Sequence, residues 1–308
     1  RQRQMCKETV TENGTDFRYE VENKPGIPTF YYYGKYNCYL ICGKTSENID
    51  VTPYKSDVRF RDNGTLAPEA PQPSKAKLLW TEDGLTMQVA TAISDNKVAV
   101  TGINGNGNAV VAITDASDNI LWSYHIWVPE IDPTTDDNLL TYAIPAASNS
   151  SGATYKVMPI ALGAMNKATV AVDGTATTDT NAKSFGLYYQ WGRKDPFIHP
   201  ANCTSYEPER EVYTEGFAFN VSYPRNARTE SPYDVMTVEW SIAHPTTFMS
   251  DAMYEDWEEW ASVVDWLYNH HPNLWGNITT SNSNISKISY KSIYDPCPVG
   301  WKVPVSYT

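Results

Sequence analysis

The stretch ILWSYHIWV (residues 120–128) constrains the fold of this chain more than any other feature of its sequence. Its side chains alternate between two faces, with Ile120, Trp122, Tyr124, Ile126 and Val128 on one and Leu121, Ser123, His125 and Trp127 on the other. A period of two residues is that of a β-strand. The stretch NAVVAITD (108–115) precedes it across a turn at residues 116–119 that is rich in Ser, Asp and Asn. The two stretches therefore predict an antiparallel hairpin.

Three further stretches before residue 130 have the same character. LTMQVATA (85–92) and KVAVTGI (97–103) flank the turn residues 94–96, and YNCYLICG occupies residues 36–43. Short strands at intervals of about 8–12 residues, with no helical period between them, are typical of a sandwich. We therefore predict a mainly β protein whose N-terminal part, residues 1–150 including a linker, is an antiparallel β-sandwich. We interpret His125 as a half-buried residue on a strand flank rather than as a site residue.

The second half of the chain has a different pattern. Acidic and then small polar residues fill the stretch between residues 129 and 153, so we place a domain boundary near residue 150 and a second domain at 151–308. Beyond the boundary, the pattern predicts a helix over residues 251–268, with Ser250 as its N-cap and Pro272 as its stop. The apolar stripe of this helix consists of Met253, Trp257, Trp260, Val264 and Leu267.

Composition and charge exclude several classes of function. The net charge is −12, and Lys and Arg form no run, which argues against nucleic acid and anionic membranes as partners. No apolar run approaches the length of about 18 residues that a bilayer span needs, so we predict no transmembrane segment. The opening RQRQMCKETV is neither a signal peptide nor a lipobox, and we interpret it as an internal or processed start.

The strongest enzyme-like feature is a group of acidic residues on the predicted helix, namely Glu255, Asp256, Glu258, Glu259 and Asp265. Paired carboxylates hydrolyse glycosides when they face each other across the sugar. Glu255 and Glu259 share one helix face, so we interpret the group as a solvated surface. No GxSxG or HExxH motif and no CxxC pair occurs. The sequence therefore predicts no catalytic residue, no cofactor and no metal site, and it leaves the ligand-binding residues unassigned.

Four stretches, taken in order, resemble a known group of surface proteins. They are NAVVAITDASDNILWSYHIWV (108–128), FGLYYQWGRKDPF (185–197), SIAHPTTFM (241–249) with LWGN (274–277), and KSIYDPCPVGWKVP (291–304). This order is similar to that of fimbrillin-related cell-surface proteins of Bacteroidales. In these proteins a β-sandwich precedes a domain of the Fibrobacter succinogenes major paralogous type, which is itself similar to C-type-lectin-like folds. The resemblance covers residues 36–304.

The resemblance implies a secreted protein of the bacterial cell surface, located at the outer membrane or in a pilus, that mediates cell adhesion as an adhesin or a fimbrial accessory or tip subunit. It implies no enzymatic activity, and partners among other pilus or surface subunits or among glycans and proteins of a host or microbial surface. It also implies an α+β, C-type-lectin-like fold for residues 151–308. That domain would be incomplete at its C-terminus, because related domains continue after the DPCPVGW turn, and Trp301 would have partners beyond residue 308.

The chain departs from this group at MPIALGA (158–164), where related domains carry MDRNLGA, so any role of those charged residues does not carry over. The calcium-binding segments of C-type lectins are absent as well, and EPER (207–210) differs from them at its third residue. Two other functions stay open: a surface glycan-binding protein of a polysaccharide-uptake system, and a glycosidase. For Arg193 we prefer an ion pair with Asp195 over contact with a ligand.

The cysteines generate a testable prediction. Cys203 is the one other cysteine beyond residue 150, so Cys203–Cys297 is the candidate disulfide of the second half, and the alternative is that Cys297 is a buried thiol. In the first half Cys6 has two candidate partners, Cys38 and Cys42, which lie about 13 Å apart along one predicted strand and so do not pair with each other. Peptide mapping under non-reducing conditions identifies the bridges. A bridge from Cys297 to the first half would contradict the boundary near residue 150.

Overall fold

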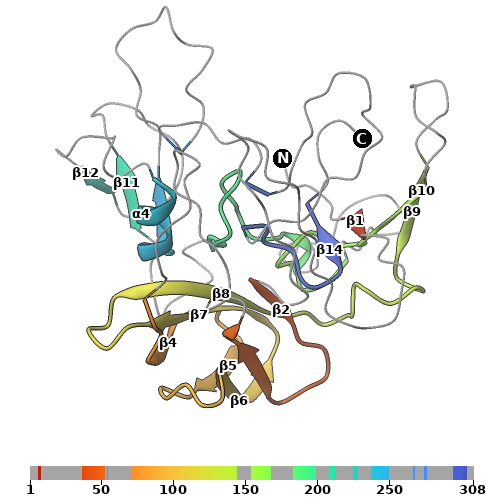
Figure 1. Cartoon of the computed structure of the whole chain (residues 1–308). Coiled ribbons are helices and arrows are strands. Elements are labelled where there is room, and N and C mark those ends of the chain that lie inside the picture. The colour runs from red at the N-terminus through yellow and green to blue at the C-terminus, as the bar shows by residue number, and fades with distance from the viewer. Residues whose placement is uncertain are drawn as a thin grey trace, which may run out of the picture.

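The computed structural model describes residues 6–7, 37–52, 54, 71–143, 154–167, 183–198, 209–212, 225–227, 237–249, 266–267, 274–275 and 294–303. Across these ranges the protein is mainly β, with few helical residues and with its strands arranged in several sheets. The predicted fold class is confirmed at this level. The strands between residues 75 and 128, orange to yellow in Figure 1, form a layered base on which the later segments lie.

The central sheet has the strand order β2-β8-β7-β4. Its strands are β2 (Cys38–Leu40), β8 (Ile120–Val128), β7 (Gly107–Thr114) and β4 (Lys75–Thr81). β7 and β8 pair antiparallel, which confirms the predicted hairpin. Asp115 closes its turn, because the Oδ1 atom accepts hydrogen bonds from the backbone N–H groups of Ser117 (2.8 Å) and Asn119 (2.9 Å).

A second sheet has the order β3-β6-β5. It consists of β3 (Glu47–Asp50), β6 (Lys97–Gly105) and β5 (Leu85–Val89), all paired antiparallel. β5 and β6 confirm the two predicted strands on either side of residues 94–96. Asp95 (φ 50°) and Asn96 (φ 59°) turn the chain between them, in a backbone region that these residue types tolerate.

The strand predicted over residues 36–43 is shorter than expected. β2 covers Cys38–Leu40 and pairs parallel with β8, and Cys42 lies beyond its end. Ile41 still donates a backbone hydrogen bond to Trp127 (2.8 Å), but Gly43, with φ 65°, then turns the chain away. The alternating pattern predicted a longer strand than β2 because it does not indicate the turn at Gly43.

Both faces of the central sheet are covered. Every residue of β7 is buried, and so is every residue of β8 after Ile120. Residues on one face of these strands share a buried cluster with residues of β3, β5 and β6: Ala109, Val111, Ile113, Tyr124, Ile126, Ile49, Leu85, Val98 and Val100. On the other face Val110 packs with Ile198. The prediction that His125 is half-buried was wrong: its exposed fraction is 2%, because a second layer covers the face that the pattern assigned to a strand flank.

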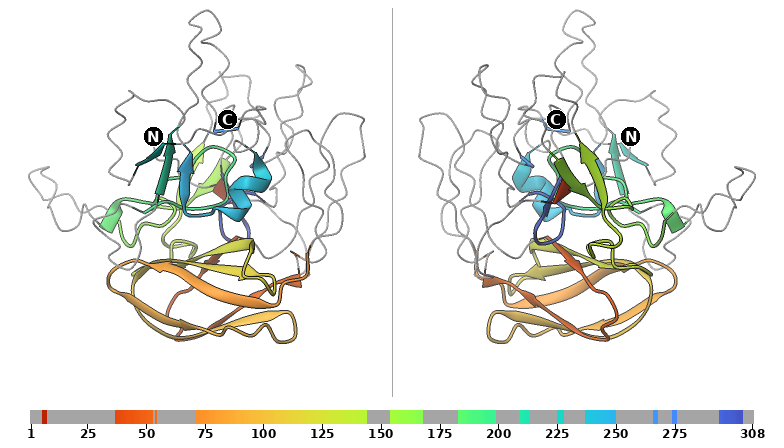
Figure 2. Two further views of the ribbon diagram at one scale, coloured as in Figure 1. Left: turned by 90° about the vertical axis from the view of Figure 1, so that its left-hand side faces the viewer. Right: turned by 90° about the vertical axis from the view of Figure 1, so that its right-hand side faces the viewer.

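The remaining strands belong to this second layer and its surroundings. One sheet has the order β14-β1-β10-β9, from β14 (Trp301–Lys302), β1 (Cys6–Lys7), β10 (Thr154–Val157) and β9 (Leu140–Ala143). Another has the order β12-β11-β13, from β12 (Arg225–Ala227), β11 (Glu209–Val212) and β13 (Thr247–Met249), with parallel pairing. The two side views in Figure 2 show these elements above the layered base.

The short helix α4 (Val238–Ala243) packs against β8. Thr237 is its N-cap, since the hydroxyl of Thr237 accepts a hydrogen bond from the backbone N–H of Trp240 (3.1 Å). Glu239 in the first turn suits the positive end of the helix dipole. The C-terminal end of α4 faces the interior and has no basic residue of its own. This end is part of the site described below.

The domain boundary near residue 150 stays a prediction. β9 and β10, on either side of this position, pair with each other, and Lys7 lies opposite Trp301 in the register of β1 and β14. Buried residues from both halves also share one cluster. Trp301 is 3% exposed within this chain.

The helix predicted over residues 251–268 lies outside the described residues except for Trp266 and Leu267, which form a bend and are buried. Its acidic residues and most of its apolar stripe therefore stay predictions. Within the described residues, no helix has the length and hydropathy needed to cross a lipid bilayer.

Candidate functional site

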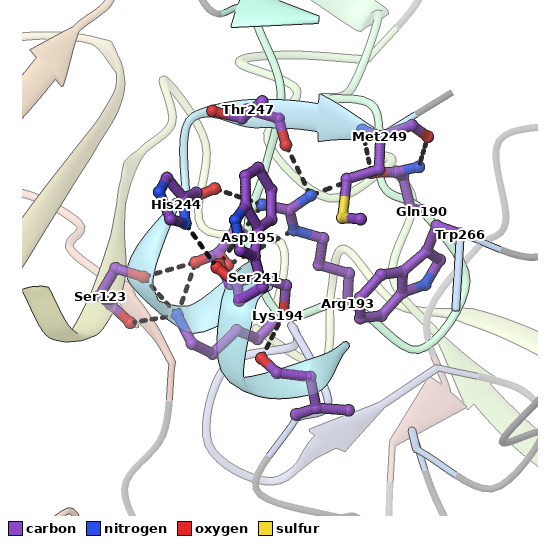
Figure 3. A network of polar contacts seen from close by, with 12 residues as sticks. Ser123, Gln190, Arg193, Lys194, Asp195, Ser241, His244, Thr247, Met249 and Trp266 are labelled. Atoms are coloured by element: carbon purple, nitrogen blue, oxygen red, sulfur yellow. Dashed lines mark hydrogen bonds and ion pairs between the residues drawn. The ribbon is translucent and has the colours of Figure 1, made fainter. Parts of the chain in front are cut away.

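Three consecutive charged residues, Arg193, Lys194 and Asp195, lie in the interior where the segment 183–198 meets β8 and α4 (Figure 3). Their exposed fractions are 1%, 3% and 2%. A turn over residues 190–193 directs these three side chains inward. In this turn the backbone N–H of Arg193 donates to the carbonyl of Gln190 (3.0 Å), and Gly192 adopts φ 84°. A Cβ atom at position 192 would also lie 2.9 Å from the side chain of Leu274. This turn therefore requires glycine.

The guanidinium of Arg193 closes the C-terminal end of α4. It donates hydrogen bonds to the carbonyls of His244 (2.6 Å) and Thr247 (2.7 Å) and to Gln190 Oε1 (3.0 Å). Carbonyls at the end of a helix lack partners within the helix and carry partial negative charge. Arg193 thus supplies from a distant segment the positive charge that α4 lacks, and the ring of Phe197 lies 4.9 Å from the guanidinium carbon.

Lys194 and Asp195 are bound to β8 through Ser123. Lys194 Nζ donates to Asp195 Oδ1 (2.6 Å), to the carbonyl of Ser123 (3.3 Å) and to the Ser123 hydroxyl. That hydroxyl in turn donates to Asp195 Oδ1 (2.5 Å). The other carboxylate oxygen, Oδ2, lies 3.7 Å from Arg193 Nε. The preferred interpretation of Arg193, an ion pair with Asp195, is confirmed.

Burial disfavours the charged forms of Arg193 and Lys194. It lowers the pKa of Lys194, and it lowers the pKa of Arg193 to about 10, while the neighbouring Asp195 carboxylate works in the opposite direction in both cases. Arg193 therefore remains a cation at neutral pH. One carboxylate pairs with two buried side-chain cations here, next to the partial negative charge at the end of α4.

A serine hydroxyl beside a lysine resembles the nucleophile and base of a hydrolase. In this site, however, Lys194 Nζ donates to the Ser123 hydroxyl and forms an ion pair with Asp195, and the Ser123 hydroxyl donates to Asp195 rather than to the amine. Ser123 is also only 2% exposed. The arrangement joins the segment 183–198 to β8 and to the end of α4.

A second polar chain crosses the same face of the central sheet. The Glu82 carboxylate accepts from Asn108 Nδ2 (2.7 Å), Asn108 Oδ1 lies 2.9 Å from His125 Nε2, and His125 Nδ1 lies 3.2 Å from the Tyr189 hydroxyl. Asn108 Nδ2 also donates to the carbonyl of Gly163 (2.8 Å). Since an amide oxygen only accepts, His125 donates from Nε2 and accepts at Nδ1 from Tyr189.

Burial sets the ionisation of this second chain. It lowers the pKa of His125 to about 3, so the ring is neutral at ordinary pH. Burial also raises the pKa of the Glu82 carboxyl, although the hydrogen bonds from Asn108 oppose this shift, and it raises the pKa of Tyr189 well above its usual value. The chain is therefore held together by directional hydrogen bonds in which His125 and Tyr189 take part as neutral groups.

The DPCPVGW turn joins the same interior through Asp295, whose side chain and carbonyl are both used. Its carboxylate accepts from the backbone N–H groups of Cys297 (2.8 Å) and Val303 (2.9 Å), and its carbonyl accepts from Asn37 Nδ2 (3.2 Å). Asn37 Oδ1 then accepts from the indole of Trp122 on β8 (2.8 Å). Asp295 therefore fixes both the shape of the turn and its position on the sheet.

Two tryptophans of the resembling stretches, Trp191 and Trp275, complete the site together with Trp266. Trp275 donates from Nε1 to the carbonyl of Arg193 (2.9 Å), and Trp266 donates to the carbonyl of Trp191 (2.5 Å). The rings of Trp191 and Trp275 lie 4.7 Å apart between centroids. All four stretches that carry the resemblance thus contribute buried residues to one interior.

Several residues singled out in the sequence lie outside the described residues: Glu255, Asp256, Glu258, Glu259, Asp265 and Cys203. Cys297 is buried, and its disulfide with Cys203 stays a prediction. Among the residues that the structure does describe, no group of three or more His, Cys, Asp and Glu side chains is placed to hold a metal ion.

Sequence reasoning missed the buried roles of Ser123, Lys194 and the chain from Glu82 to Tyr189. One signal was available for Lys194. The run Arg193-Lys194-Asp195 stands between Trp191 and Phe197 in an otherwise apolar stretch, and charged residues enclosed by aromatic residues indicate paired burial. No local signal distinguished the second chain, because its members are far apart in the sequence.

No model of a known protein family, no curated protein and no solved structure matches this chain. The functional conclusions below therefore depend on the geometry of the chain and on the resemblance of its motifs.

The charge balance of the site predicts unequal effects of two substitutions. Asp195→Asn removes the carboxylate that pairs with both cations, and removing one partner of a buried ion pair costs about 3–5 kcal/mol in the free energy of unfolding. Lys194→Met leaves Arg193 and Asp195 as a balanced pair, so we expect a smaller loss. Urea unfolding of the two variants beside the wild type measures both effects. A larger loss for Lys194→Met than for Asp195→Asn would show that the charge balance is not what stabilises the site.

The buried histidine predicts a loss of stability in acid. The folded state keeps His125 neutral down to about pH 3, whereas the unfolded chain takes up a proton near pH 6.5. The free energy of unfolding therefore falls as the pH drops below 6.5, by about 1.4 kcal/mol per pH unit. The raised pKa of Glu82 acts in the opposite direction, because the folded state binds that proton first.

The variant His125→Gln isolates the contribution of the histidine. Between pH 6.5 and pH 5 the wild type should lose about 2 kcal/mol more than this variant, since only the wild type has the titrating ring. Urea unfolding curves of both proteins at the two pH values measure the difference. Equal pH dependence in the two proteins would contradict a neutral, buried His125.

Proposed function

We propose that this chain is an attachment subunit of a bacterial cell surface, either an adhesin or an accessory or tip subunit of a pilus. The observation that carries the proposal is the position of the motifs that it shares with such proteins. Arg193, Asp195, Asp295 and Trp301 belong to these motifs, and each is at most 3% exposed. The shared residues therefore build the interior of the protein.

This position favours a binding protein over an enzyme. The shared motifs of an enzyme family include groups that reach the substrate, whereas the shared residues here hydrogen-bond to one another and to the backbone. A scaffold of this kind leaves contact with partners to exposed residues and loops. Attachment to a glycan or protein of another surface, or to other pilus subunits, requires only that the interior hold these exposed residues in place.

The proposal extends to the fold and the location. The sheets β2-β8-β7-β4 and β3-β6-β5 share one buried cluster, which supports an N-terminal β-sandwich. The helix α4, the short sheets and the DPCPVGW turn support an α+β, C-type-lectin-like second part. Secretion and a place at the outer membrane or in a pilus follow from the resemblance.

Attachment can be measured with the purified chain. Beads coated with the protein should bind bacterial or epithelial cell surfaces in a saturable way, and soluble protein should compete with them. Beads coated with heat-unfolded protein are the matched control, because they have the same composition and the same net charge of −12. Binding equal to that of this control on every surface tested would refute an attachment function.

A second candidate function is a surface glycan-binding protein of a polysaccharide-uptake system. It is favoured by two exposed aromatic side chains, Phe185 (64% exposed) and Tyr188 (56%). Pull-down with insoluble polysaccharides distinguishes the candidates, because an uptake protein retains one defined polymer without any cell surface present. Release of reducing sugar in the same tubes would instead indicate a glycosidase.

A further inference from the structure

Two large aromatic rings are exposed on one short segment of the second layer. Phe185 and Tyr188 are 64% and 56% exposed, and they stand three residues apart in the segment 183–188. The other large apolar residues exposed in the described parts of the chain are aliphatic and lie on separate segments: Leu78, Leu140 and Val299. Single exposed apolar residues are normal on a protein surface, whereas exposed apolar residues that lie together mark interaction sites.

Backbone hydrogen bonds hold the segment that carries the rings on either side of Phe185. The backbone N–H of Leu187 donates to the carbonyl of Leu162 (2.9 Å), and that of Met165 donates to the carbonyl of Lys183 (2.8 Å). Phe185 therefore lies between two points at which the segment is hydrogen-bonded to its neighbour. A Cβ atom at Gly186 would lie 2.4 Å from the Leu162 carbonyl oxygen, so the two backbones are in close contact.

Tyr188 is held equally firmly. Its backbone exchanges two hydrogen bonds with Phe197, of 3.0 and 2.8 Å. The neighbouring Leu187 and Tyr189 point into the protein, where Tyr189 bonds to His125. The buried site described above thus fixes the backbone from which both rings project. Rings on a fixed backbone lose little conformational entropy when they bind a ligand.

Polar side chains lie at the start of the same segment and next to it. Lys183 forms an ion pair with Glu130, and Asn166 donates from Nδ2 to the Glu130 carboxylate (2.8 Å). The next residue, Lys167, donates from Nζ to Asn138 Oδ1 (2.9 Å). These hydrogen bonds hold amide, carboxylate and ammonium groups in place at the surface, where each group keeps capacity for further bonds.

We propose that residues 183–188, with Glu130 and Asn166, form a binding site for neutral carbohydrate. A sugar ring has an apolar face that packs on an aromatic ring, and hydroxyl groups at its edge that both donate and accept hydrogen bonds. Fixed rings on a segment that starts next to amide and carboxylate groups match both properties. The protein carries a net charge of −12, which disfavours sulfated and sialylated ligands.

This inference deepens the proposed attachment function, on which it rests for its biological meaning, but it can be tested separately. The probe is an array of immobilised neutral, sialylated and sulfated oligosaccharides, to which the full chain is applied. The test variants are Phe185→Ala and Tyr188→Ala, and the matched control is Val299→Ala, which removes an exposed apolar side chain elsewhere (51% exposed). Thermal unfolding of all four proteins establishes that they fold alike.

The wild type should bind one or more neutral glycans, each test variant should bind them at least tenfold more weakly, and the control should bind as the wild type does. No binding to neutral glycans, or equal binding by the wild type and the test variants, overturns the site. The bead assay separates the two proposals. Attachment to cells that both test variants retain, together with no binding of the wild type to neutral glycans, refutes the carbohydrate site and leaves the attachment function standing. Glycan binding by the wild type without attachment to any cell surface supports the carbohydrate site and refutes the attachment function.

Discussion

The described structure depends on one carboxylate that pairs with two buried cations. Asp195 pairs with Lys194 and Arg193, and each cation joins the segment 183–198 to a different element. Lys194 connects it to β8 through Ser123, while Arg193 connects it to the end of α4. Buried charges are costly unless they are paired and hydrogen-bonded. The layer above the central sheet is therefore fixed in position by the need to satisfy these three side chains.

The face of the central sheet that meets this layer is polar for the same reason. Asn108 and His125 project from β7 and β8 into an interface, and their partners come from segments that follow much later in the sequence. Polar groups in such an interface determine how the two layers are oriented, because each group forms hydrogen bonds only with partners in the right geometry. Hydrophobic burial on the opposite face holds the two sheets together without that requirement.

This division of roles connects the interior with the proposed function. The buried bonds that hold Tyr189 inward also fix the backbone from which Tyr188 projects. In the proposed function, recognition comes from the exposed residues between the buried ones. An exposed ring costs little stability when a firmly packed neighbour holds its backbone, so Phe185 and Tyr188 are available for a partner.

The sequence by itself determined the mainly β class, the hairpin of β7 and β8, and the pairing of Arg193 with Asp195. Each of these depends on residues close together in the chain, where periodicity and turn chemistry are informative. Tertiary structure alone decided that the second face of ILWSYHIWV is buried, because a face of mixed polarity has the same pattern whether it meets water or another protein layer. It also decided that Asn37 bonds to Asp295, 258 residues away. Contacts at such separations leave no local trace, since the partners meet only when the whole chain has folded.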